Sequence, residues 1–323
     1  MRVIYVFRVV IFSVLALVVG SACAQHYPSR PIRWIIDFPA GGASDTLARV
    51  VGEKLTQSLG QQVVYDNRPG ANGIIAYSIA ARAPADGYTL VVLSTPFPLN
   101  AALGRKLPYD TLKDFTPIAR IADYPNLLVV HPSVPVRSVK EFTAYAKSKA
   151  GVLTYASSGT GSVQHLAMEQ FRRLGGFDAV HVPYAGSAPA VANLAGGQVD
   201  SAVTILITAS PHLRAGRIRA VGVMSTNRSS QLPEVPTFAE SGVPLVASGW
   251  GGMGAPAGFP KQLIKRLNSE IARIVNLPDV RERIAFVGAE PHHSGPDDFA
   301  TFIRSEFDRW QPIIQQAGVR IDN

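Results

Sequence analysis

The stretch IRWIIDFPAGGASD, residues 32–45, decides how this chain begins to fold. Its first six residues are mostly apolar and typical of a buried strand, and residues 38–45 bring two adjacent glycines. A helix with one buried face is predicted next, because an apolar residue recurs every four positions at Leu47, Val51, Leu55 and Leu59. A strand, a glycine loop and a helix in this order place bare backbone where a ligand can come close.

Strand-like and helix-like segments alternate beyond this point. In the first part of the chain, residues 62–66 and 88–94 are predicted strands, and a helix is predicted over 74–82. A similar cycle starts near Asn126, and it includes a helix that opens with a capping box, Ser138 three residues before Glu141. Its predicted strands lie in residues 126–132, 152–158, 177–184, 199–206 and 218–225. Such alternation predicts parallel strands with helical crossovers, hence an α/β fold.

The last third of the chain is predicted to be helical and too poor in strands for an α/β domain of its own. Apolar residues keep a helical rhythm up to Ile314, and we expect this part to pack back on the first lobe. The chain would then cross between two lobes near residues 121–124 and 224–226. We therefore predict two doubly wound sheets joined by a double-crossover hinge, with the C-terminal helices on lobe 1. The predicted division is residues 25–123 plus 226–323 for lobe 1 and 124–225 for lobe 2.

Composition narrows the class of protein. The 323 residues are 47% hydrophobic and 17% charged, which suits a buried core. The formal net charge is +8, but the basic residues are scattered without aromatic interleaving, so we expect no nucleic-acid partner. The single cysteine excludes an intrachain disulfide and a cysteine metal cluster.

Residues 1–24 have the pattern of a secretory signal peptide. Arg2 and Arg8 accompany an apolar run over residues 9–20, and small residues follow up to Ala24. A membrane anchor would need about 20 apolar residues. Lipidation at Cys23 is the minority alternative, because Gly20 stands where lipoprotein signals usually carry leucine. The sequence therefore predicts export to the periplasm with cleavage after Ala24.

Three loops at predicted strand ends carry donors suited to an anion. The first is residues 38–45, where Ser44 or Asp45 can cap the following helix. The second is SSGTGS, residues 157–162, and the third is VPYAGS, residues 182–187. Backbone N–H groups and hydroxyls at a helix N-terminus favour negative charge. Any one loop could be an ordinary turn, but three of them in two lobes favour a binding site.

Catalytic and cofactor motifs are missing. Neither glycine loop has the lysine of a phosphate-binding loop, and Gln164 stands where a dinucleotide fingerprint needs its third glycine. No G-x-S-x-G pentapeptide occurs, and the histidines form no metal-spaced cluster. We expect no catalytic residue, metal or cofactor. The alternative of another class is an exported serine hydrolase that uses Ser158 or Ser162 with His165.

Nine segments of the chain, in order, resemble the tripartite tricarboxylate transporter receptor family, also called Bug proteins. They are YPSRPIRWIIDFPAGGASD, NRPGANG, APADGYTL, DFTPIA, SSGTGS, HVPYAGSAPA, LAGGQVD, LPEVPTFAESG and APAGFP. The resemblance implies a two-lobed periplasmic-binding-protein fold of type II-like form that closes on a small carboxylate: a di- or tricarboxylate, an acidic amino acid or an aromatic acid. It also implies that residues 38–45 grip one carboxylate, often through ordered water, that the second-lobe loops form the other wall, and that residues 94–97 border the pocket.

We therefore predict a non-enzymatic, monomeric solute-binding protein whose partners are the membrane permease subunits of such a transporter or, alternatively, a sensor kinase. Asp37 departs from the family, which usually has an apolar residue or proline there, and we expect it to point away from the ligand or to pair with an arginine. The predicted ligand-binding residues are Phe38, Ala40, Gly41, Gly42, Asp45, Ser94, Thr95, Ser158, Gly159, Thr160, Gly161, Tyr184, Ala185, Gly186 and Asp200.

Overall fold

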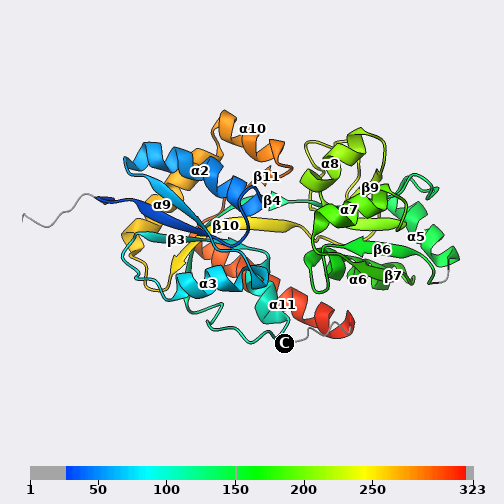
Figure 1. Cartoon of the computed structure of the whole chain (residues 1–323), viewed down its shortest axis with the longest axis horizontal. Helices are drawn as coiled ribbons and strands as arrows, with labels where there is room; N and C mark the ends of the chain where they lie inside the picture. The colour runs from blue at the N-terminus through cyan, green and yellow to red at the C-terminus, as the bar shows by residue number, and fades with distance from the viewer. Residues whose placement is uncertain (1–26, 150, 318–323) are drawn as a thin grey trace, which may run out of the picture.

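The computed structural model describes residues 27–149 and 151–317. These residues form an α/β protein with one sheet in each of two lobes (Figure 1). The predicted fold class is confirmed. The predicted signal peptide and Cys23 lie outside the described residues. Within the described part of the chain, no helix combines the length and the apolar character that a bilayer crossing requires.

The first lobe is built on a six-stranded sheet in the order β11-β4-β10-β3-β1-β2. Strands β2 and β3 pair parallel with β1, whereas β10 is antiparallel to both β3 and β4. Trp34 and Ile35 point into different apolar clusters, so both faces of the sheet are buried. The strands are β1 (Ile32–Ile36), β2 (Val63–Asn67), β3 (Thr89–Ser94), β4 (Phe115–Tyr124), β10 (Gly249–Pro256) and β11 (Glu290–Pro291).

Helices cover both faces of this sheet (Figure 1). One face packs against α2 (Ala43–Leu59), α9 (Lys261–Val275) and α10 (Pro278–Phe286). The other face is covered by α3 (Ile74–Ala81), preceded by the short η1 (Ala71–Gly73), by α4 (Pro96–Ala102) and by the start of α11 (Pro296–Ala317).

The second lobe contains a five-stranded sheet in the order β7-β6-β8-β5-β9. The parallel strands β7, β6 and β8 bring their carboxyl ends to one edge. Its strands are β5 (Asn126–Val130), β6 (Thr154–Ser157), β7 (Val180–Pro183), β8 (Ser201–Ile205) and β9 (Arg219–Val223). Helices α5 (Val139–Ser148) and α6 (Val163–Gly175) cover one face, and α7 (Ser187–Ala195) and α8 (Leu206–Arg214) the other. The predicted capping box is confirmed, because the Ser138 side chain accepts from the N–H of Glu141.

The chain passes between the lobes at two places. Strand β4 ends at Tyr124 and β5 begins at Asn126, whereas the return path starts after β9 and reaches β10 only at Gly249. The two paths are joined, because the Met224 N–H donates to the Asn126 carbonyl at 2.8 Å and the Ala247 N–H to the Met224 carbonyl at 2.8 Å. They form a double crossover.

Residues 226–247 of the return path pack with the second lobe. Phe238 and Leu245 belong to the apolar cluster of the second sheet, although the sequence-based division assigns them to lobe 1. Their burial favours a return point near residue 248. The lobe boundaries remain a prediction, in which we now place the return to lobe 1 near residue 248 and not near residue 226.

Helix α11 connects both lobes. It begins on the first sheet, where Phe299 and Ile303 are buried, and its far end reaches the second-lobe cluster through Trp310 and Ile314. The C-terminal helices thus pack on lobe 1 as predicted, and the end of α11 contacts the second lobe as well.

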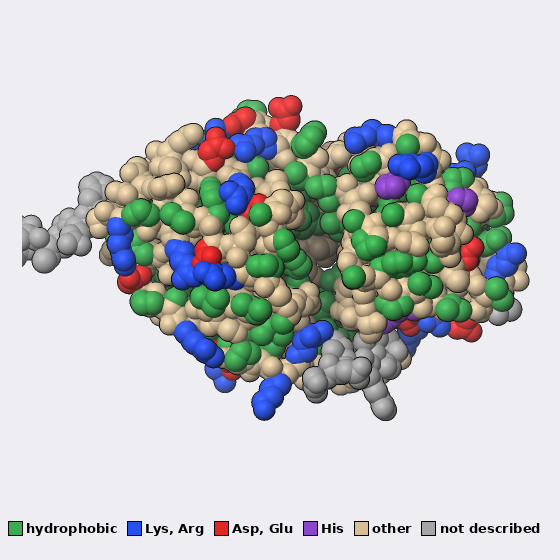
Figure 2. All heavy atoms as spheres, viewed as in Figure 1, with side chains coloured by type: hydrophobic (Ala, Val, Ile, Leu, Met, Phe, Trp, Pro, Cys, Tyr) green, Lys and Arg blue, Asp and Glu red, His purple; other side chains and the backbone are tan. Residues whose placement is uncertain are grey.

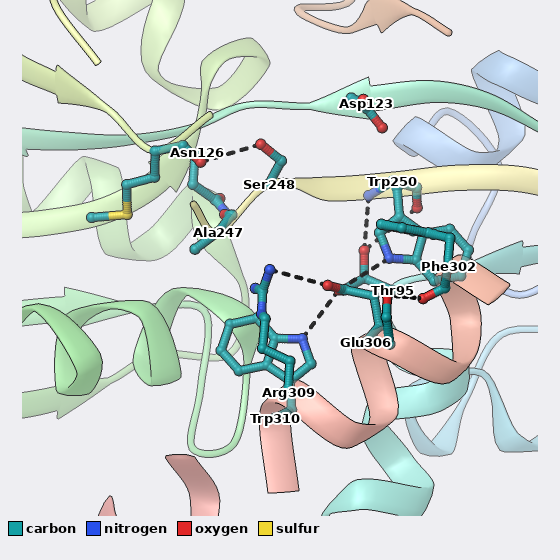
Figure 3. Close-up of polar contacts among 12 residues, drawn as sticks. Thr95, Asp123, Asn126, Ala247, Ser248, Trp250, Phe302, Glu306, Arg309 and Trp310 are labelled. Atoms are coloured by element: carbon teal, nitrogen blue, oxygen red, sulfur yellow. Dashed lines mark hydrogen bonds and ion pairs between the residues drawn. The ribbon is translucent and has the colours of Figure 1, made fainter. Parts of the chain in front are cut away.

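A buried glutamate fixes α11 beside the return crossover. Glu306 is 3% exposed and accepts hydrogen bonds from the indoles of Trp250 at 3.4 Å and Trp310 at 3.2 Å (Figure 3). The Arg309 guanidinium lies 3.1 Å from the same carboxylate. Because Trp250 belongs to the first-lobe core and Trp310 to the second, this one carboxylate links the two lobes.

Candidate ligand-binding site

The first-lobe loop, residues 38–45, connects the end of β1 to the start of α2. Gly41 has φ +81°, a left-handed conformation that favours glycine. The N–H of Gly41 donates to Asp45 at 2.8 Å, and that of Gly42 donates to the Pro39 carbonyl at 3.2 Å. The two glycines therefore shape the loop, while their amides are already used inside it.

The donors that remain in this loop are the first amides of α2. Gly42 is the N-cap of α2, and no side chain of the part of the chain that the structure describes caps the helix, so the N–H groups of Ala43 and Ser44 have no helical partner. The expected side-chain cap by Ser44 or Asp45 is wrong. These amides lie at the positive end of a 17-residue helix, which favours an anion.

Asp45 holds the loop in shape from within. Its carboxylate is buried and accepts from the Gly41 N–H, from the Asn67 amide at 3.0 Å and from the Arg49 guanidinium at 2.8 Å. Asn67 also donates to the Phe38 carbonyl at 3.0 Å. Burial alone would raise the pKa of Asp45, but the hydrogen bonds from Arg49, Gly41 and Asn67 outweigh it and lower the pKa. Asp45 is therefore an ionised structural residue of the loop.

Ser94 and Thr95 lie at the end of β3, beside β1. Both are buried, and their hydroxyls are engaged within the protein. The Ser94 hydroxyl donates to Asp37, and the Thr95 hydroxyl accepts from the Trp250 N–H at 2.9 Å (Figure 3). Thr95 thus connects this edge of the first sheet to the return crossover.

The second-lobe loop, residues 157–162, connects β6 to α6. Gly159 and Gly161 have φ of +131° and +75°. The Gly161 N–H donates to the ring Nδ1 of His165 at 3.1 Å, and the Ser162 hydroxyl caps α6 by accepting from the His165 N–H at 3.2 Å. Thr160, at the tip, is exposed.

Two stacked histidines lie under this loop. The rings of His165 and His181 are 3.9 Å apart and nearly parallel, and the His181 Nε2 lies 2.7 Å from the Ser157 hydroxyl. Burial lowers the pKa of His165, and burial together with His165 lowers the pKa of His181 to about 4. Both rings are therefore neutral at pH 7, which leaves Nδ1 of His165 able to accept from Gly161.

The third loop, residues 182–187, lies directly on the second. The N–H of Tyr184 donates to the Ser157 carbonyl at 3.2 Å, and that of Gly186 donates to the Ser158 carbonyl at 3.2 Å. Gly186 is the N-cap of α7 and no side chain caps that helix. Tyr184, Ala185 and Gly186 thus bring the uncapped N-terminus of α7 beside that of α6.

Asp200 is the predicted residue that the structure separates from the others. Its carboxylate accepts from the N–H and hydroxyl of Thr154, each at 2.8 Å, at the beginning of β6. The ligand loops follow the other end of that strand. We leave Asp200 out of the proposed site.

Two residues beside the second-lobe loop were not predicted. The Ser158 hydroxyl donates to the Gln164 side chain at 2.8 Å, and Gln164 donates to the buried Asn126 amide group at 3.0 Å. Asn126 in turn donates to the Ala247 carbonyl in the return path. This chain of amides connects the loop to the hinge. The signal in the sequence is a glutamine, Gln164, in the first turn of the predicted helix directly after the glycine loop.

The serine hydrolase alternative lacks its geometry. Within the described residues, neither hydroxyl is bonded to the ring of His165: the Ser158 hydroxyl donates to Gln164, the Ser162 hydroxyl accepts from the backbone N–H of His165, and Nδ1 of the ring accepts from Gly161. In the same part of the chain, no group of three or more metal-binding side chains occurs.

The loops of the two lobes face a hollow between them. Figure 2 shows this hollow as a vertical groove, and in Figure 1 α2 lies on one side of it and α7 on the other. The lobes also touch beside it. Ile205 and Ile207, at the start of α8, pack against the first-lobe core, and Glu290 of β11 accepts from the Ser230 N–H at 2.9 Å. The fold and these facing loops define a two-lobed binding protein.

Comparison with known proteins identifies the family. Residues 47–319 match the model of the tripartite tricarboxylate transporter family receptor. BugT of Bordetella pertussis is 37% identical over 314 residues, 96% of each chain. The chain therefore belongs to this family of extracytoplasmic solute-binding receptors.

Two solved structures are similar over nearly the whole chain. Rpa4515 of R. palustris, solved with adipate, is 36% identical with a TM-score of 0.80, and the match covers 91% of this chain and 99% of that one. MatC of Rhodopseudomonas palustris, solved with bound malate, is 33% identical with a TM-score of 0.75, with coverage of 89% and 100%.

Proposed function

We propose that this protein captures a small carboxylate between its two lobes and delivers it to the membrane subunits of a tripartite tricarboxylate-type transporter. The observation that carries the proposal is the set of uncapped or hydroxyl-capped helix N-termini, those of α2, α6 and α7, on the two sides of one hollow. Adipate in one relative and malate in another support a carboxylate as the ligand class.

The loops favour an anion without any basic side chain. Residues 38–45, 157–162 and 182–187 contain no lysine or arginine. Binding would depend on N–H groups, hydroxyls and helix dipoles, which gain strength when closure removes water. Such a site fits a carboxylate, whose two oxygens can accept several hydrogen bonds. The proposed contacts are to residues 38–45 and 94–95 in the first lobe and to residues 158–161 and 184–186 in the second.

The protein acts as a binder and not as an enzyme in this proposal, because the serine and histidine side chains of the second-lobe loop are used to hold that loop. Its proposed location is the periplasm, which follows from the predicted signal peptide and from the extracytoplasmic role of the family. A sensor kinase in place of a permease is the alternative partner for the same binding event.

Titration calorimetry tests the ligand class. Adipate, malate, citrate, glutamate and benzoate are compared with a neutral sugar of similar size. We expect at least one acid to bind, and binding to weaken little with salt, because no exposed basic side chain lies in the loops. If the sugar binds and none of the acids does, the carboxylate proposal is wrong.

A further inference from the structure

Asp37 is a buried acid directly beneath the proposed ligand loop. It follows β1 and precedes Phe38, the first residue of the loop, and it is only 1% exposed. Ala40 is the third residue after Asp37, so the chain can place the two no more than about 11 Å apart. This separation is comparable to the Debye length of about 10 Å at 0.1 M salt, and salt screens a buried charge much less than an exposed one, so a charge on Asp37 would act on a ligand at this loop.

The hydrogen-bond partners of Asp37 are all neutral hydroxyls. Its Oδ2 accepts from the Tyr77 hydroxyl of α3 at 2.7 Å and from the Ser94 hydroxyl at the end of β3. Ser44, in the first turn of α2, faces the same carboxyl group. The second oxygen, Oδ1, is buried and has no hydrogen-bond partner among the described residues. Of the two expectations for Asp37, pairing with an arginine is therefore wrong within the described residues, and pointing away from the ligand stays a prediction.

No cation within the described residues compensates Asp37. It takes part in none of the ion pairs there, whereas Asp45, eight residues on, pairs with Arg49. The titratable groups that face Asp37 from neighbouring elements are Tyr77 of α3 and Tyr124 of β4, and burial raises the pKa of both. Ionising an isolated carboxyl group in such surroundings costs free energy, so the neutral acid is favoured. Burial likewise raises the pKa of Asp37, and the nearby hydroxyls of Ser94, Tyr77 and Ser44 offset this only in part.

A carboxylate ligand on the loop would add a second negative charge close to Asp37. Two like charges in a site of low dielectric disfavour each other, and one of them takes up a proton instead. We propose that Asp37 is the proton-binding specificity residue of this site: neutral, it admits a carboxylate to the first-lobe loop, and ionised, it repels one. This rests on the proposed carboxylate function and makes uptake of a proton part of ligand binding.

The variant Asp37→Asn tests the proposal, because asparagine keeps the shape and the acceptor oxygen but carries no charge at any pH. Affinity for adipate and malate is measured by calorimetry between about pH 6.5 and 9, where both carboxyls of each acid are ionised. We expect the wild-type affinity to fall with rising pH relative to the variant, by up to about tenfold per pH unit over part of this range. If the affinities of wild type and Asp37→Asn change with pH in the same way, the proposal is overturned.

Asp66→Asn is the matched control. Asp66 lies in β2 of the same lobe, but it pairs with Arg33 and with Arg68, and despite burial these partners lower the pKa of Asp66. It is ionised throughout the pH range of the experiment, so its variant should keep the wild-type pH profile. If the control changes the profile as Asp37→Asn does, the effect is not specific to Asp37, and the proposal fails.

Proton uptake gives a second readout that a structural role of Asp37 would not change. Calorimetry of wild-type protein in two buffers of different ionisation enthalpy should show a fraction of a proton, up to about one, taken up per ligand bound. This measurement needs no variant. The uptake is expected at the upper end of the range of about pH 6.5 to 9, where free Asp37 is at least partly ionised, and zero uptake at every pH of that range overturns the proposal. Conversely, tighter binding of an amino acid than of a simple dicarboxylate, lost in Asp37→Asn, would show an ionised Asp37 that pairs with an ammonium group, which also overturns it.

A ligand-free measurement separates this inference from the proposed function. With a pKa raised on folding, the stabilising contribution of the neutral acid is complete at low pH and is lost as pH rises through the folded-state pKa. The unfolding free energy of wild type should therefore fall with rising pH relative to Asp37→Asn even if no acid tested binds. A pH-independent difference in unfolding free energy between the two proteins would overturn the proposal by itself.

Discussion

The two lobes present similar glycine loops to the hollow, yet they stabilise them by different chemistry. In the first lobe, an ionised carboxylate, Asp45, holds the Gly41 amide, with Arg49 and Asn67 as further partners. In the second lobe, the corresponding acceptor for the Gly161 amide is the neutral ring of His165. One loop depends on a negative charge inside it and the other does not.

This difference has a consequence for anion binding. The charge of Asp45 is compensated locally by Arg49, at 2.8 Å, so its net effect on a ligand is small. The second loop brings no negative charge, and its histidines stay neutral at pH 7. In both loops the helix N-termini therefore remain the main source of positive potential at the site. The two loops should nevertheless respond differently to mutation and to pH.

The largest expected effect is that of Asp45→Ala. The change leaves the Gly41 N–H and the Asn67 amide without their buried acceptor, so we expect a loss of about 2–4 kcal/mol in unfolding free energy. Ligand affinity should fall about tenfold or more, since the loop loses its fixed shape. Chemical denaturation and calorimetry measure the two effects.

Arg49→Ala is the control for Asp45→Ala. The arginine is the exposed partner of the pair, and its side chain is 46% exposed. We expect Arg49→Ala to lower the unfolding free energy by about 1 kcal/mol or less. Equal losses in the two variants would show that the ion pair, and not the bond to Gly41, shapes the loop.

A pH change should loosen the second-lobe loop first. The pKa of His181 is lowered to about 4 and that of His165 is also lowered. Unfolded histidine titrates near pH 6.5, so their contribution is complete above that value and is lost as pH falls toward 4. The pKa of Asp45 is lowered too, but its contribution begins to fall only near pH 4. Hydrogen-exchange protection of the Gly161 amide should therefore decrease between about pH 6.5 and 4.5, while that of Gly41 stays constant.

The variant His165→Asn sharpens this test, because its side chain does not titrate. In that variant the protection of Gly161 is expected to be low and to change less with pH over the same interval, because only His181 of the pair still titrates. If both amides lose protection together in wild type, the two loops do not differ in the way that their acceptors indicate.

The smallest effect is expected for Gln164→Ala. This change removes one hydrogen bond to Ser158 and one to Asn126 in a half-buried position. We expect the binding free energy to weaken by about 1 kcal/mol, which is roughly a fivefold loss of ligand affinity. Gln170→Ala is the control, because Gln170 lies on the same helix and its side-chain oxygen has no partner within the described residues. Similar affinities of the two variants would argue against a link between loop and hinge.

Much of the fold could be predicted from the sequence because its signals are local. The alternation of strands and helices, the capping box at Ser138 and the crossover before Asn126 each depend on residues close together in the chain. The position of the return crossover stays a prediction, and we move it toward residue 248 because Phe238 and Leu245 are buried in the second lobe, a long-range contact that local patterns do not reveal. The same reason explains why the contact of α11 with that lobe was not foreseen.

For the candidate site, the sequence determined which loops carry glycine and hydroxyl groups and where helices begin. Only the tertiary structure decided which donors remain available, since the amides of Gly41 and Gly161 turned out to be bonded to Asp45 and His165. It also decided that Asp37 lies among hydroxyls, with no cation paired to it in residues 27–149 and 151–317. The physical reason is that propensity and patterning act between neighbours in the chain, whereas the partners of a buried polar group are brought by segments that are distant in sequence.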